Sequence, residues 1–205
     1  MLGAHGRSIT RALFTPLARL LARRGVTPDA VTIAGTVVSI GTAVVALPLG
    51  WVWQGALVLA VVLFLDSVDG TLARMTTGGT PFGAFLDSTL DRLSDGAVFA
   101  SLTAFAVFSM SEGPARTAAI IAGLVAVVGA ATVPYARARA ESVGVSAAVG
   151  IAERTDRLVV ALTGAFLADV GLSDWFVAVG LIWVAFASLV TVVQRIAVTA
   201  RELGR

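Results

Sequence analysis

Residues 66–91 read DSVDGTLARMTTGGTPFGAFLDSTLD and place four carboxylates, Asp66, Asp69, Asp87 and Asp91, in a largely apolar chain. The first two are three positions apart and the last two are four apart, so each pair shares one face of a helix. Two glycines and a proline between the pairs predict a turn that joins antiparallel helices. At about 1.5 Å per residue, Asp69 and Asp87 would lie at one height, with Asp66 facing Asp91 about one turn deeper.

These carboxylates predict a metal site, because four converging acids repel one another unless cations lie among them. Hard oxygen ligands favour Mg²⁺ or Mn²⁺, and the chain has no cysteine and only one histidine to suit a softer metal. Nearby residues suit a diphosphate. Gly70 permits close approach to the backbone, Arg74 can bind phosphate in a bidentate manner, and Thr80 can donate a hydroxyl.

The composition predicts a membrane protein. Of 205 residues, 57% are hydrophobic and only 14% are charged, and the mean hydropathy is +0.90. A soluble chain of this length could not bury so many apolar runs, so we expect an all-α integral membrane protein with one domain over residues 1–205. No basic tail suggests nucleic acid as a partner.

Six transmembrane helices are expected, preceded by an amphipathic helix at 8–24 that lies in the membrane interface. The expected spans are about 30–49, 52–74, 82–109, 116–138, 157–171 and 175–196. All fifteen basic residues are arginine, and with six spans every one except Arg116 falls on the side of the two termini. The positive-inside rule therefore predicts a multi-pass protein of the cell membrane with both termini and the carboxylates near the cytoplasmic face.

The whole pattern is Asp66-x-x-Asp69-Gly70-x-x-Ala73-Arg74, eight residues, then Gly83-x-x-x-Asp87-x-x-x-Asp91. At every fixed position it resembles the signature of the CDP-alcohol phosphatidyltransferases, which join a CDP-linked lipid to an alcohol and release CMP. The resemblance implies that the four aspartates bind two Mg²⁺ ions, and that Asp91 is also the catalytic base that deprotonates the acceptor hydroxyl. It further implies a homodimer and CDP-diacylglycerol contacts from Asp29, Ala30, Val31, Thr32, Gly70, Arg74 and Thr80.

Two later segments, YARARAESVG at 135–144 and GIAERTDR at 150–157, resemble the actinobacterial branch of that family that makes phosphatidylinositol phosphate. The acceptor of that branch, 1D-myo-inositol 3-phosphate, carries its own phosphate and needs a second anion site, which guanidinium groups suit. The residues expected there are Arg137, Arg154, Arg157 and Arg195.

Other interpretations stay open at this point. The acceptor could be glycerol 3-phosphate, giving phosphatidylglycerol phosphate. The carboxylates could line the path of a cation transporter, although such a path has no use for Arg74 beside its ligands. They could also be structural acids paired with Arg74 and Arg92, and the later arginines could serve topology alone. Asp95 lies outside the signature and is expected to cap a helix or to pair with an arginine.

Overall fold

The computed structural model describes residues 6–76 and 78–204, with side chains described from Thr15 onward except that of Ser67. In these residues the chain forms helices and no strand, which confirms the all-α prediction. The helices are α1 Gly6–Arg23, α2 Pro28–Ala46, α3 Val52–Leu65, α4 Ser67–Thr76, α5 Pro81–Phe108, α6 Pro114–Ser142, α7 Arg154–Asp169 and α8 Trp175–Glu202.

Four helical stretches among the described residues are long and apolar enough to cross a membrane. They are α2, the continuous stretch Val52–Thr76, α6 and α8. The chain is therefore a multi-pass membrane protein. The other two expected spans correspond to α5, which has 28 residues and carries the second aspartate pair, and α7, which has 16 residues.

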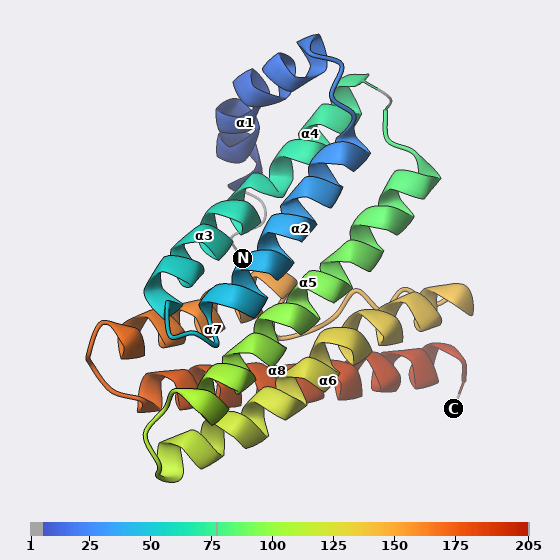
Figure 1. Ribbon diagram of the computed structural model, residues 1–205. Helices are drawn as coiled ribbons and strands as arrows, with labels where there is room; N and C mark the ends of the chain where they lie inside the picture. The colour runs from blue at the N-terminus through green and yellow to red at the C-terminus, as the bar shows by residue number, and fades with distance from the viewer. Residues whose placement is uncertain (1–5, 77, 205) are drawn as a thin grey trace.

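Most helix boundaries differ from the expected spans by a few residues, and two of the differences affect the site. The stretch predicted at 52–74 is interrupted at Asp66, where α3 ends and α4 begins. The Asp66 N–H still donates to Val62 O at 2.9 Å, so α4 continues α3 closely (Figure 1). Helix α7 begins at Arg154 rather than 157, because the Asp156 carboxylate accepts the Glu153 N–H at 3.0 Å and secures the first turn.

The turn predicted between the aspartate pairs is present and places the start of α5. Gly78 and Gly79 have φ values of 74° and 87°, in the left-handed region where glycine carries no Cβ penalty. Thr80 then accepts the Gly83 N–H at 2.9 Å and caps α5. The chain reverses here, so α4 and α5 run in opposite directions with their aspartates facing each other.

The helices pack in two groups around one main core (Figure 1). Helices α2, α3–α4 and α5 lie side by side, and α1 lies against α4. Helix α6 packs against both α5 and α8, and α7 packs against both α3 and α8. Small residues allow close crossings, as where Gly180 of α8 approaches Val160 of α7. This arrangement brings the first turn of α7 beside the aspartates of α3–α5.

Candidate active site

Three of the four predicted metal ligands come together between α3–α4 and α5. One carboxylate oxygen from each of Asp66, Asp69 and Asp87 lies within 4.8 Å of the other two. Oxygens that share one Mg²⁺ lie up to about 4.2 Å apart, since each is about 2.1 Å from the ion. Small side-chain rotations would therefore let these hard donors hold a divalent cation, so the residues fit the predicted metal.

Asp69 is the most buried of the three, at 8% exposure, and its orientation is set by its neighbours. The Thr32 hydroxyl of α2 donates to Asp69 Oδ2 at 2.6 Å, and the Gly70 N–H donates to Oδ1. Thr32 is expected from the signature to contact CDP-diacylglycerol. In the structure its hydroxyl orients a carboxylate of the cluster, as hydrogen-bond partners of metal ligands commonly do.

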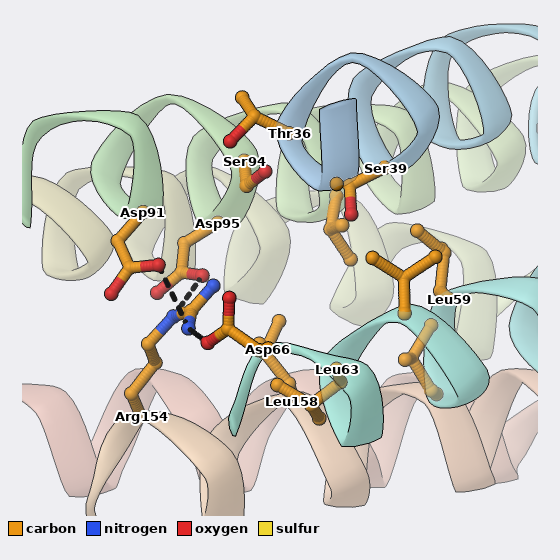
Figure 2. Close-up of a pocket in the computed structure, with 14 residues that line it drawn as sticks. Thr36, Ser39, Leu59, Leu63, Asp66, Asp91, Ser94, Asp95, Arg154 and Leu158 are labelled. Atoms are coloured by element: carbon orange, nitrogen blue, oxygen red, sulfur yellow. Dashed lines mark hydrogen bonds and ion pairs between the residues drawn. The ribbon is translucent and has the colours of Figure 1, made fainter. Parts of the chain in front are cut away.

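Asp91, the predicted base and fourth ligand, lies next to this cluster and is bound by two arginines. Its Oδ1 is 2.9 Å from Arg154 Nη1 and its Oδ2 is 3.2 Å from Arg92 Nη2. The same Arg154 Nη1 is 2.8 Å from Asp66 Oδ2 (Figure 2). Asp66 and Asp91 are thus brought together through one guanidinium, across the gap between α3–α4 and α5.

Asp95, one turn beyond Asp91, is paired with an arginine and does not cap its helix. Its carboxylate is 1% exposed and accepts a hydrogen bond from Arg154 Nε at 2.8 Å (Figure 2). The guanidinium of Arg154 therefore contacts three carboxylates from two segments of the chain. The alternative expectation that Arg74 pairs with the cluster is not met in the structure, where Arg74 Nη2 donates to Thr71 Oγ1 at 3.2 Å.

The residues predicted to bind the CDP group lie around the ends of α2, α4 and α5. A Cβ added at Gly70 would lie 3.5 Å from Arg74 Nη1, so the guanidinium passes over bare backbone. A Cβ added at Gly83 would lie 3.2 Å from Asp29 Oδ1, which brings the start of α2 against the start of α5. Two other residues predicted to contact the CDP group have partners within the protein. The Ala30 N–H donates to Thr27 Oγ1, and Val31 packs against the cluster of Ala18, Val68 and Leu72.

A cavity of about 970 Å³ adjoins the carboxylates, within the size range of small-molecule sites. All four arginines predicted to bind the acceptor phosphate line it: Arg137, Arg154, Arg157 and Arg195. Asp91 also lines it, so the predicted base faces the basic cavity. Arg92, which the sequence offered only as a structural partner of the acids, does pair with Asp91, and its side chain lines the cavity as well. Its place in the cavity was not predicted, and the available signal was its position directly after Asp91.

Arg157 is the most deeply buried of these arginines. It is 3% exposed, and neither its Nε nor its Nη1 has a hydrogen-bond partner among the described residues. A buried guanidinium without partners is costly, so in a membrane protein it is a candidate for binding a ligand. The others are held in place: Arg195 donates to Val149 O at 3.0 Å, and Arg137 pairs with Glu141 at 2.8 Å.

Fold and site together define a helical membrane protein with a carboxylate site for divalent cations beside an arginine-lined cavity, an arrangement suited to phosphate-group transfer. The chain belongs to the CDP-alcohol phosphatidyltransferase family, whose profile matches residues 25–192, and it is therefore an enzyme of that class.

Characterised relatives cover most of the chain. Phosphatidylinositol phosphate synthases of Mycobacterium bovis and Mycolicibacterium smegmatis are each 42% identical over 92% of this chain, and over 88% and 86% of their own lengths. The Corynebacterium glutamicum synthase is 36% identical over 98% of this chain and 90% of its own.

Two crystal structures of the Mycobacterium tuberculosis phosphatidylinositol phosphate synthase have the same fold. One, with CDP-diacylglycerol bound, has a TM-score of 0.85 at 40% identity, covering 92% of this chain and 94% of that one. The other, in complex with manganese and citrate, has a TM-score of 0.84 at 41% identity, covering 91% and 88%. Together with the aspartate cluster, the manganese complex supports a divalent-metal site in this chain.

Proposed function

We propose that this chain is a phosphatidylinositol phosphate synthase. It transfers the phosphatidyl group of CDP-diacylglycerol to a hydroxyl of 1D-myo-inositol 3-phosphate and releases CMP. The observation that carries this assignment is the arginine-lined cavity that opens beside Asp91, with the buried and unpaired Arg157 in its wall. An acceptor that brought no anionic group would leave that guanidinium without a partner.

The metal ligands are Asp66, Asp69, Asp87 and Asp91, and Mg²⁺ is the expected ion, with Mn²⁺ as a substitute. We propose two ions. When bound, they would neutralise charge on the diphosphate and on the departing CMP. The hydrogen bond from Thr32 presents one Asp69 oxygen in a fixed direction, which supports tight binding of the cation.

Asp91 is the proposed catalytic base. It lies at the boundary between the carboxylate cluster and the basic cavity, where an acceptor hydroxyl and the lipid-side phosphorus would meet. Its carboxylate would take the proton of the attacking hydroxyl, and the new phosphorus–oxygen bond would form as the bond to CMP breaks. Binding the diphosphate and the acceptor on the two sides of Asp91 would supply the orientation that this displacement needs.

The acceptor phosphate would bind Arg137, Arg154, Arg157 and Arg195, which come from α6, α7 and α8 and line one cavity. Guanidinium groups match phosphate oxygens in pairs. The diphosphate of CDP-diacylglycerol would lie along Gly70 and Arg74, with Thr80 and the Asp29–Thr32 turn beside it.

We further propose six spans within a single domain over residues 1–205. Helix α5 has 28 residues and a length of about 42 Å, and α7 has 16 residues and a length of about 24 Å. The arginine distribution supports cytoplasmic termini and a cytoplasmic active site in the cell membrane. Helix α1 buries Ala18 against α4 and exposes Leu17 and Leu20, which supports a place in the lipid interface. We also propose a homodimer, which cross-linking in native membranes would test.

The deciding experiment is CMP release by the purified protein with CDP-diacylglycerol, Mg²⁺ and one of three acceptors. We expect turnover with inositol phosphate and none with free inositol. Turnover with glycerol 3-phosphate alone would keep the family chemistry and overturn the acceptor. Cation flux in liposomes without CMP release would indicate a transporter instead.

A further inference from the structure

Asp95 has no place in the reaction described so far, yet it is the most buried carboxylate near the site. It lies on α5 one turn beyond Asp91 and is 1% exposed. Its neighbours in the small cavity include Ser94, Val98 and Leu158. Keeping an ionised carboxylate at such a place is costly unless a partner compensates it, and the partner is Arg154.

Arg154 stands where the two parts of the site meet. It borders both the small cavity with Asp66 and Asp91 and the larger basic cavity. Its contacts to the described carboxylates use Nε and Nη1 only, so Nη2 is the guanidinium nitrogen left for a further oxygen. It is the first residue of α7, and the capping contacts of Glu153 and Asp156 secure the turn from which its side chain extends.

The three carboxylates around Arg154 are not equivalent. Asp66 and Asp91 share its Nη1, and both are proposed metal ligands, so a cation competes with Arg154 for their oxygens. Asp95 alone binds Nε, at 2.8 Å, and it lies apart from the three carboxylates grouped for metal binding. The contact to Asp95 is therefore the one that can persist while the metal ligands are in use.

From this geometry we infer that Asp95 is a positioning residue for the acceptor: it holds Arg154 by Nε so that the remaining guanidinium edge faces the acceptor phosphate. This inference rests on the proposed function. A guanidinium fixed in advance loses less side-chain freedom when the phosphate binds, and the acceptor affinity rises accordingly. The simpler alternative is that Arg154 only neutralises a buried acid and that Asp95 affects stability alone.

The test is a double-mutant cycle of Asp95→Asn and Arg154→Lys, with KM measured for both substrates. Lysine keeps the charge of Arg154 but cannot form the fork. For Asp95→Asn we expect the KM for inositol phosphate to rise about tenfold with kcat within about threefold, a typical loss for one charge-assisted hydrogen bond. The KM for CDP-diacylglycerol should stay within about twofold. Because Asp95 acts through Arg154, the double variant should be little worse than Arg154→Lys.

A matched control is Asp169→Asn. Asp169 also accepts a hydrogen bond from another helix, the Trp53 N–H at 2.7 Å, and does not line either cavity of the site. Its loss can lower the melting temperature but should leave both KM values unchanged. Titration of inositol phosphate into the Mn²⁺-loaded protein, followed by calorimetry, provides a binding readout that does not depend on turnover.

The outcomes distinguish the proposed function from the role inferred for Asp95. A wild-type protein that releases no CMP with inositol phosphate overturns the proposed function. A wild-type protein that turns over, with an unchanged acceptor KM in Asp95→Asn, overturns the inference alone. If the increases in acceptor KM of the two single variants multiply in the double variant, the two residues act independently, and the inference is overturned as well. If Asp95→Asn does not fold, an unchanged acceptor KM in Arg154→Lys would do the same.

Discussion

Thr32 Oγ1 donates a 2.6 Å hydrogen bond to Asp69 Oδ2, although 37 positions separate the two residues in the chain. The bond joins α2 to α4 and orients the Asp69 carboxylate, which groups with those of Asp66 and Asp87. A ligand oriented in this way loses less freedom when a cation binds, so the contact links helix packing to metal affinity.

Replacing Thr32 with valine should therefore weaken metal binding with little change of shape. We expect Thr32→Val to lower the affinity for Mn²⁺ about tenfold, the smaller of the losses usual for partners of metal ligands. Electron paramagnetic resonance of free Mn²⁺ would measure it. The control is Thr132→Val on α6, whose hydroxyl donates to Val128 O of its own helix at 2.8 Å. Equal Mn²⁺ affinity in both variants would contradict the role given to Thr32.

The proposed base gives a second prediction. Asp91→Asn should reduce CMP release by at least about 10²-fold, the lower range for loss of a general base. The protein should still elute as the wild type does in gel filtration, because asparagine has the same shape. Glu112→Gln, a change at a carboxylate 94% exposed in the loop before α6, should leave the rate unchanged. Activity retained in Asp91→Asn would require another base.

Arg157 predicts a separation of stability from function. Its Nε and Nη1 are buried without hydrogen-bond partners, so Arg157→Met removes a costly group and should not lower the melting temperature. The same change should raise the KM for inositol phosphate roughly 10- to 100-fold, as expected for a lost charge-assisted contact. Arg139→Met, at an exposed arginine outside the cavity, should change neither value. A lower melting temperature with an unchanged KM would make Arg157 a structural residue.

The crossing of α7 and α8 gives a prediction about stability alone. A Cβ added at Gly164 would collide with the backbone carbonyl of Phe176, which cannot move without shifting α8. Gly164→Ala should destabilise the protein by about 1–3 kcal/mol, as overpacked interiors usually do. A Cβ at Gly41 would meet nothing within 4 Å, so Gly41→Ala is the matched control. Thermal unfolding in detergent compares the two variants, and equal midpoints would contradict the packing described here.

The helices, the turn before α5 and the positions of the aspartates could be predicted, because each depends on residues close together in the sequence. Apolar runs near membrane length predicted helices, and the glycines at 78 and 79 predicted the reversal before α5. Helical periodicity then placed Asp66, Asp69 and Asp87 on facing surfaces, because a helix fixes the direction of each side chain from its position alone. The interruption at Asp66 and the start of α7 at Arg154 were missed, since both depend on single backbone and capping contacts.

The sequence by itself determined the helices, the turn and the set of carboxylates, since each follows from spacing along one or two neighbouring helices. Only the tertiary structure decided that Arg154, 88 positions after Asp66, lies among three of the aspartates, and that Arg92 joins the other arginines in one cavity. The physical reason is that these contacts depend on how α7 and α8 pack against α3 and α6. That packing is set by small residues and side-chain volumes from distant segments, for which no local periodicity exists.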